Sequence, residues 1–179
     1  MKSKTGVAVF GGGCFWCTEA VFAELKGVLK VTPGYTGGRT TDPTYQQVCG
    51  GNTGHVEAAR IEYDPALISY SDLLEVFFYT HDPTTPNQQG NDFGEQYHST
   101  IFYVDDTQKE LAQKFIATLN AGKVYDAPVV TTLKPLTTFY EAEDYHRGYY
   151  QKNEGHVYCR LVIAPKLAKL REKFKSSLK

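Results

Sequence analysis

The stretch VAVFGGGCFWCTEAVFAEL, residues 7–25, decides how this chain of 179 residues is organised. Its apolar start, residues 7–10, is typical of a short buried strand, and the apolar residues of its second half recur at helical spacing. Gly27 then provides a helix stop. The pattern therefore predicts that Cys14 lies where a glycine-rich turn leads into the first turn of a helix.

A helix start changes the chemistry of a thiol. The first backbone N–H groups have no partner inside the helix, and the helix dipole is positive there, so both favour a thiolate. A free cysteine has a pKa of about 8.5. The helix terminus contributes roughly 0.3–1 kcal/mol, or ~2 when it is partly buried, and one pKa unit is about 1.4 kcal/mol. This brings the Cys14 pKa only near neutrality, so we expect another group to assist Cys14.

Composition limits the class of protein. Hydrophobic residues make up 41% and charged residues 22%, as is usual for globular proteins, and the length suits a single domain over residues 1–179. Lys and Arg number 19 against 20 for Asp and Glu, so the charge gives no sign of a nucleic-acid partner. No apolar window is long enough for a membrane span, and we expect no membrane partner.

The four cysteines point to thiol chemistry in a reducing compartment. The basic start of the chain, followed by the apolar residues 7–10, weakly resembles a signal peptide, but this apolar run is too short for one. We therefore expect a cytoplasmic location.

The order of the expected elements predicts an α+β fold. Strands are predicted at 7–10, 28–31, 55–63, 100–104 and 129–133, with helices after residue 14, from residue 71 and around residues 111–119. This order matches the ferredoxin-like split βαβ sandwich, with an additional helix and strand. Residues 33–38, 41–44 and 84–96 are expected as loops, and residues 45–49 as a short helical turn. Residues 145–164 are expected as a partly irregular tail carrying Cys159, where a short strand is the alternative, and residues 165–179 as a basic terminal helix.

Glu57 stands out on the third strand. Strand alternation places it on the same face as Ala59, Ile61 and Tyr63. Burial among apolar residues disfavours the charged carboxylate, so its pKa should rise and Glu57 could donate a proton. A salt bridge to a lysine at the rim of the strand explains the same pattern equally well.

Three other features carry weaker signals. The long loop at residues 87–98 suits a functional role, although its Gly, Asn and Asp residues also suit plain turns. Phe15 and Trp16 could form a dry pocket wall, or could simply pack in the core. The Cys-x-x-Cys pair Cys14 and Cys17 also suits a thioredoxin-like redox pair, whereas a zinc site lacks a second pair of ligands.

Together these motifs make the chain resemble the A-type peptide methionine sulfoxide reductases. The family's motifs occur in the same order between Val7 and Cys159, so the resemblance covers nearly the whole chain. It is carried by GCFW with Glu19 (residues 13–19), GYTGG (34–38), PTY (43–45), TGHVEA (53–58), HDPT (81–84), QGNDFGEQY (89–97) and FYEAEDYH (139–146).

The resemblance implies a separate role for each of several residues around the sulfoxide group of the substrate. Cys14 corresponds to the nucleophile that attacks the sulfoxide sulfur, and Glu57 to the acid that protonates the sulfoxide oxygen. Tyr45 and Tyr97 match tyrosines that hydrogen-bond this oxygen, and Asp92 matches a supporting carboxylate. Protonation is needed because a sulfoxide oxygen leaves poorly otherwise.

The family also implies the substrate and the reductant. Phe15 and Trp16 match the wall that accepts the methionine methyl group, and the substrate is the S epimer of methionine sulfoxide, free or in oxidised proteins and peptides. No metal or bound cofactor is implied. The expected product on the nucleophile is a sulfenic acid, which a second thiol converts to an intramolecular disulfide that thioredoxin reduces. Such a protein repairs oxidative damage, and we expect it to be a monomer.

The identity of the second thiol is open. The family's recycling cysteine commonly lies near the C-terminus, which favours Cys159 over Cys17, with Cys49, expected as a small buried residue, third. Two other functions remain as alternatives: a dithiol-disulfide oxidoreductase that uses Cys14 and Cys17 without Glu57, and a small zinc-binding interaction module.

Overall fold

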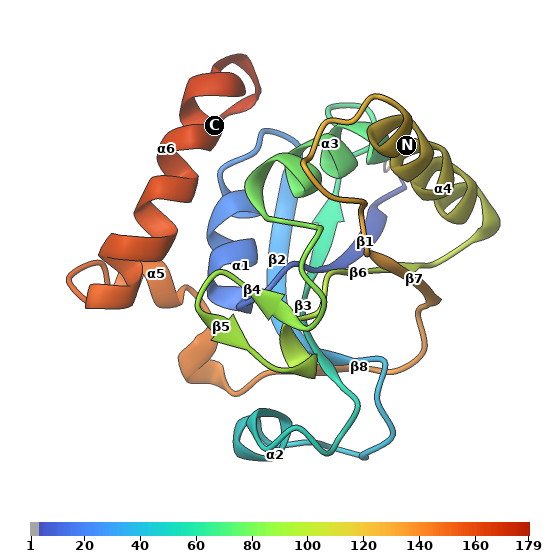
Figure 1. The fold of residues 1–179 in the computed structure, drawn as a ribbon. Coiled ribbons are helices and arrows are strands. Elements are labelled where there is room, and N and C mark those ends of the chain that lie inside the picture. The colour runs from blue at the N-terminus through green and yellow to red at the C-terminus, as the bar shows by residue number, and fades with distance from the viewer. Residues whose placement is uncertain (1–3) are drawn as a thin grey trace.

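A mixed six-stranded sheet, with the strand order β7-β6-β1-β3-β2-β8, forms the centre of the computed structural model, which describes residues 4–179 (Figure 1). Its strands are β1 (Gly6–Gly11), β2 (Val28–Thr36), β3 (Val56–Tyr63), β6 (Thr100–Tyr103), β7 (Thr132–Pro135) and β8 (Phe139–Glu141). The short strands β4 (Gln88–Gln89) and β5 (Asp92–Phe93) form a separate hairpin. The α-helices are α1 (Phe15–Ala23), α2 (Tyr45–Cys49), α3 (Tyr70–Thr80), α4 (Asp106–Ala121), α5 (Tyr149–Lys152) and α6 (Ala164–Lys173).

The four central strands confirm the predicted α+β fold. The chain runs β1-α1-β2-β3-α3-β6, and the neighbouring strands in the order β6-β1-β3-β2 are all antiparallel. This is the split βαβ arrangement. Strand β7 adds to it in parallel with β6, and β8 adds to the other edge beside β2.

The expectation of a loop over residues 33–38 was wrong for residues 33–36. Strand β2 continues through Thr36, because its backbone pairs with β3 on one side and β8 on the other. Pro33 and Gly34 are usually signs of a turn. Here Gly34 is needed for a close approach, since a Cβ on it would lie 2.4 Å from the ring of Phe139. Long-range pairing therefore overrides the local signal.

The core lies mainly on the face of the sheet covered by α1 and α3. Alternate β1 residues, Ala8 and Phe10, point into this side, where they meet Phe22 and Phe77. A smaller cluster on the other face contains Val9, Val56, Ala58 and Phe102. None of the helices in residues 4–179 is both long and apolar enough to cross a membrane.

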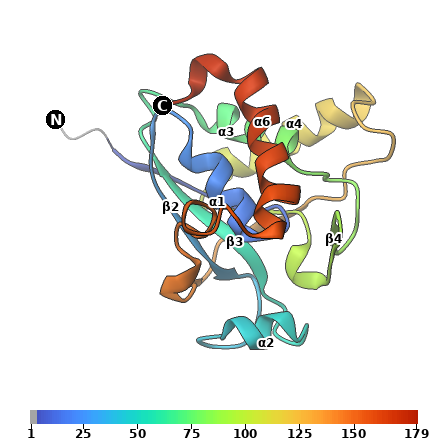
Figure 2. The same cartoon turned by 90° about the vertical axis from the view of Figure 1, so that its left-hand side faces the viewer.

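The C-terminal segment forms short helices that pack back on the domain. The 3-10 turn η2 (Asp144–His146) leads to α5, and the π-helical turn η3 (Cys159–Ile163) leads directly into α6. Helix α6 lies beside α1 (Figure 2), and both η3 and α6 contact that helix. The alternative of a strand at Cys159 was therefore wrong. The predicted terminal helix ends at Lys173, followed by the 3-10 turn η4 (Lys175–Ser177).

Candidate active site

Cys14 is the N-cap residue of α1, as the sequence predicted. Its carbonyl accepts hydrogen bonds from the backbone N–H groups of Cys17 (3.1 Å) and Thr18 (3.4 Å). Gly13 has φ +94°, which favours glycine, and a Cβ there would lie 2.6 Å from Cγ of Gln89. The glycine therefore lets the chain turn sharply into the helix beneath the β4–β5 hairpin.

Glu57 lies in the interior beside this turn. It is 1% exposed, and its Oε1 accepts a hydrogen bond of 3.2 Å from the backbone N–H of Phe15. In the described chain, Oε2 is buried with no hydrogen-bond partner. Burial raises the pKa of Glu57 to about 8, although the Phe15 N–H opposes the shift. Glu57 is thus a neutral carboxylic acid at pH 7, and the alternative of a lysine salt bridge at the rim was wrong.

The Cys14 thiol differs from the expectation based on the helix start. Burial raises its pKa well above the ordinary value, the hydrogen bond with Cys17 and the nearby Glu57 raise it further, and only the backbone N–H of Trp16 lowers it. The expected shift of the Cys14 pKa toward neutrality was therefore wrong. The sequence shows where a helix starts, but it does not show how deeply its N-cap is buried.

Cys17 carries the lower pKa of the two thiols. The hydrogen bond with Cys14 lowers the pKa of Cys17 to about 7 against the effect of burial, and the charge of Lys166 and the hydroxyl of Tyr158 help. The Cys17 Sγ lies 3.7 Å from the Tyr158 hydroxyl. The two thiols form one coupled pair in which negative charge is more stable on Cys17.

The predicted oxygen-binding residues surround Glu57 from different parts of the chain. Tyr45 lies at the start of α2 and Tyr97 in the 3-10 turn η1 (Glu95–Tyr97). Burial raises the pKa of both phenols, and the charge of Glu57 is the next cause for each. Both hydroxyls therefore stay protonated as donors. Asp92, in β5, accepts a hydrogen bond of 2.6 Å from Tyr158.

Phe15 and Trp16 have different surroundings. Phe15 is fully buried, and its ring centroid lies 4.9 Å from that of His146. Trp16 is partly exposed and stacks on Tyr149, with 3.6 Å between the ring centroids and 4° between the planes. Trp16 can therefore form a wall at the surface of the site, with Phe15 packed behind it.

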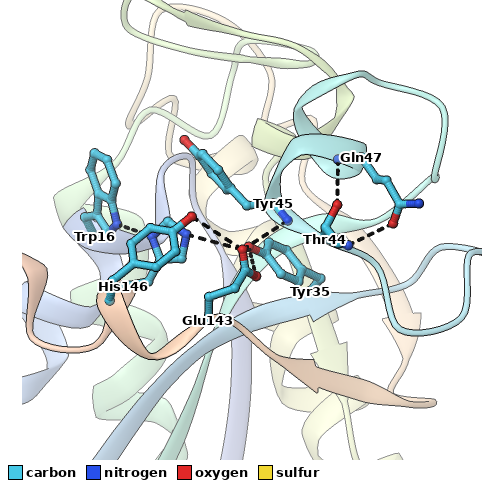
Figure 3. A network of polar contacts seen from close by, with 8 residues as sticks. Trp16, Tyr35, Thr44, Tyr45, Gln47, Glu143 and His146 are labelled. Atoms are coloured by element: carbon cyan, nitrogen blue, oxygen red, sulfur yellow. Dashed lines mark hydrogen bonds and ion pairs between the residues drawn. The ribbon is translucent and has the colours of Figure 1, made fainter.

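Sequence reasoning missed a polar network that holds these aromatic rings (Figure 3). The indole N–H of Trp16 donates to Nδ1 of the fully buried His146 at 2.9 Å. Glu143 accepts from the Tyr35 hydroxyl at 3.0 Å and from the Tyr45 backbone N–H at 3.2 Å. Both acceptors, His146 and Glu143, lie in the FYEAEDYH motif. This motif indicated the family, but nothing in the sequence shows that it contacts the aromatic rings of the site.

The two other cysteines belong to other elements, Cys159 to η3 and Cys49 to the end of α2. Cys159 is 0% exposed in η3, and burial raises its pKa, with the charge of Cys17 as the second cause. Cys49 is exposed at the end of α2, so the expectation that it is buried was wrong. All four cysteines are free thiols in this structure.

Cys14 and Cys17 open together into a cavity of about 500 Å³. Its other walls come from the β4–β5 hairpin and from the helical segment at residues 157–166. In residues 4–179, no group of three or more His, Cys, Asp or Glu side chains is placed to hold a metal ion. The arrangement suits thiol chemistry assisted by a neutral acid.

Comparisons with known proteins identify the family of this chain. The sequence model described as "Peptide methionine sulfoxide reductase" matches residues 6–178. The protein "Peptide methionine sulfoxide reductase MsrA" of Chromobacterium violaceum is 57% identical over 167 residues, which are 93% of this chain and 95% of that protein. Mxr1 of Saccharomyces cerevisiae in reduced form is similar in structure, with a TM-score of 0.80, 32% identity, and coverage of 89% of this chain and 91% of that one. Mxr1 in complex with Trx2 matches with a TM-score of 0.56 at 22% identity, covering 83% and 87% of the chains, and this likeness shows the fold alone.

Proposed function

This chain belongs to the peptide methionine sulfoxide reductase family, as an MsrA-type oxidoreductase, and we propose that it reduces the S epimer of methionine sulfoxide with the residues around Cys14. The observation that carries the proposal is the Glu57 carboxyl group. It is buried and neutral at pH 7, it lies beside the first turn of α1, and one of its oxygens has no partner within the described residues.

In the reductive step, the oxygen of the sulfoxide moves to Cys14. Glu57 donates its proton to the sulfoxide oxygen through Oε2, and Tyr45 and Tyr97 donate hydrogen bonds to the same oxygen. The Cys14 sulfur bonds the sulfoxide sulfur, and its proton returns to the Glu57 carboxylate. The protonated oxygen then moves to the Cys14 sulfur: a sulfur–oxygen bond forms on Cys14, while the sulfur–oxygen bond of the substrate and the transient sulfur–sulfur bond break. The methionine sulfur gains two electrons and Cys14 loses two, so the products are methionine and a Cys14 sulfenic acid.

This step also solves the problem of the high Cys14 pKa. A buried thiol with a raised pKa is a weak nucleophile in the unliganded site. When Glu57 gives its proton to the substrate, its carboxylate becomes a base that can take the proton from Cys14. Cys14 is therefore activated only when a sulfoxide is bound.

Three contacts from different directions support a preference for one epimer. Trp16, with Phe15 packed behind it, accepts the methyl group, Glu57 and the two tyrosines hold the oxygen, and Cys14 approaches the sulfur. A stereocentre fixed at three points cannot be inverted without the loss of at least one contact, which supports a preference for one epimer; the family resemblance implies that it is the S epimer. Asp92 supports the site from the β4–β5 hairpin, as the family resemblance implies.

The sulfenic acid on Cys14 is resolved by a second thiol. The sequence favours Cys159, whereas the structure favours Cys17, because its thiol interacts with that of Cys14 and has a pKa of about 7. We propose a Cys14–Cys17 disulfide as the first oxidised product. Cys159, which is 0% exposed, is the alternative.

The remaining steps follow from the family. Thioredoxin is the proposed reductant of the disulfide; one structure of the yeast relative Mxr1 is a complex with Trx2. Oxidised proteins and peptides are the proposed substrates in the cytoplasm, and the enzyme is proposed to act as a monomer.

A single-turnover experiment with the Glu57→Gln variant tests the proposal. Glutamine keeps an oxygen for the Phe15 N–H but has no acidic proton, so methionine formation from the S epimer should slow by roughly 10²–10⁴-fold. Glu62→Gln, on the opposite face of β3, is the matched control and should react at the unmodified rate. A Glu57→Gln variant as fast as that control would refute the role of the acid.

A further inference from the structure

The hydroxyl of Tyr158 lies between two groups of the active site. Its oxygen is 2.6 Å from Oδ2 of Asp92 and 3.7 Å from Sγ of Cys17. Tyr158 is the last residue before the π-helical turn η3, and its ring meets Trp16 edge-on, with 5.8 Å between centroids. Neither the proposed reductive step nor the sequence motifs give this side chain a function.

The protons available for these two hydrogen bonds decide which group donates in each. A tyrosine hydroxyl has one proton to donate and lone pairs to accept with, and a carboxylate only accepts. The short bond to Asp92 uses the Tyr158 proton, so a protonated Cys17 makes its contact by donating to the Tyr158 oxygen. Once Cys17 is a thiolate, the Tyr158 hydroxyl can donate to it, which lowers the Cys17 pKa. The groups thus form a directed path for a proton, from Cys17 through Tyr158 to Asp92.

Asp92, at the end of this path, lies in the cavity where the group leaving Cys14 needs a proton. Cys14, Cys17, Asp92 and Tyr158 all line the same cavity of about 500 Å³. A sulfenic acid on Cys14 would therefore share this cavity with both ends of the path. To form a disulfide, a Cys17 that is still protonated must lose its proton, and the hydroxyl that leaves Cys14 must gain one.

We propose that Tyr158 is a catalytic residue of disulfide formation, which passes the proton of Cys17 to Asp92 while Cys17 attacks the Cys14 sulfenic acid. This inference rests on the proposed function, with Cys17 as the resolving thiol. It gives Asp92 a second task, since the protonated Asp92 then donates to the leaving hydroxyl group.

The step balances in atoms and charge. The sulfur–sulfur bond between Cys17 and Cys14 forms while the sulfur–oxygen bond on Cys14 breaks. The thiol proton moves to the Tyr158 oxygen, the original Tyr158 proton moves to Asp92, and Asp92 gives a proton to the departing hydroxide, which leaves as water. Tyr158 and Asp92 end in their starting states, and no outside oxidant is needed because the sulfenic acid is reduced.

The surroundings of Tyr158 favour such a transfer over ionisation. Burial and the charges of Cys14, Cys17 and Asp92 raise the pKa of Tyr158, so a free phenolate does not form. A hydroxyl that accepts one proton while it donates another stays neutral throughout. After the transfer, the Tyr158 hydroxyl donates to the Cys17 thiolate, which the charge of Lys166 also stabilises.

Tyr158→Phe tests the proposal, because it removes the hydroxyl and keeps the ring that packs against Trp16. The full-length reduced protein is mixed with one equivalent of the S-sulfoxide of N-acetylmethionine, and methionine formation and thiol loss are followed separately by rapid quenching. Tyr150→Phe is the matched control, since Tyr150 is not among the cavity-lining residues of the described chain. Both variants are also made in a Cys159→Ser background.

We expect Tyr158→Phe to slow thiol loss roughly 10²-fold more than it slows methionine formation. The sulfenic acid should accumulate and be trapped by a carbon nucleophile such as dimedone. The pH profile of thiol loss should move to higher pH, since the variant loses a contact that lowers the Cys17 pKa; Cys14, Lys166 and Asp92 still face that thiol.

Three results would overturn the proposal. These are thiol loss at the unmodified rate, equal slowing of both steps, or loss of the disulfide in Cys159→Ser while Cys17→Ser retains it. Failure of the proposed function is separate, because the unmodified protein would then form no methionine at all.

Discussion

Glu57→Gln should change how the stability of the folded protein depends on pH. In the folded chain, burial raises the pKa of Glu57 from 4.5 to about 8. In the unfolded chain the carboxyl group is in water and titrates near its ordinary value. Between these two pKa values, the folded state keeps a proton on Glu57 that the unfolded state has released.

The sign and the size of the effect follow from this difference. Stability falls as pH rises wherever the folded state binds more protons, by about 1.4 kcal/mol per pH unit for one group. Glu57 therefore has no such effect below pH 4.5, costs about 3 kcal/mol at pH 7, and costs about 5 kcal/mol above its folded pKa. Glutamine has no proton to exchange, so Glu57→Gln should gain stability relative to the unmodified protein as pH rises.

Urea unfolding at pH 5, 6, 7 and 8, with thiols kept reduced, measures this difference. Trp16 is the only tryptophan and reports on the site by fluorescence. Glu62→Gln controls for the removal of a carboxyl group outside the core. If the free-energy difference between Glu57→Gln and the unmodified protein stayed constant from pH 5 to pH 8, Glu57 would be ionised in the folded protein, and its role as a neutral acid would be refuted.

Two further predictions concern the supports of the site. His146→Phe leaves the Trp16 indole N–H without its acceptor, which should cost about 1–3 kcal/mol of unfolding free energy, measured by urea unfolding. It should also lower kcat/KM for the sulfoxide, measured by steady-state kinetics. Unchanged kinetics would show that Trp16 needs no such support. Thr44→Ala breaks the capping box of α2 and should cost about 1 kcal/mol and lower kcat/KM by loosening Tyr45. Ser69→Ala breaks the same kind of cap on the distant α3, so it should match the stability loss without the kinetic loss.

Much of the fold could be predicted because it follows from local patterns. The glycine turn before Cys14, the alternation through β3 and the amphipathic face of α3 each carry their own signal. The alternation of β3 alone placed Glu57 on an apolar face, and the structure shows it buried there. Pro33 and Gly34 were misread because the pairing that extends β2 comes from strands far along the chain.

The parts of the site that escaped prediction depend on contacts between distant segments. The bond between Trp16 and His146 joins residues 130 positions apart, and the contact between Cys17 and Tyr158 joins residues 141 positions apart. The raised pKa of Cys14 has the same origin, since burial by the whole fold outweighs the helix start. Motifs show which residues matter, whereas these long-range contacts show what each residue does.

The most direct test of the central claim is a single turnover with one equivalent of the S-sulfoxide and no reductant. The unmodified chain, with its four thiols, should release one methionine and keep two free thiols, and peptide mapping should find Cys14 linked to Cys17. Cys14→Ser should release no methionine and keep its three thiols. Methionine released by Cys14→Ser would contradict the assignment of Cys14 as the nucleophile.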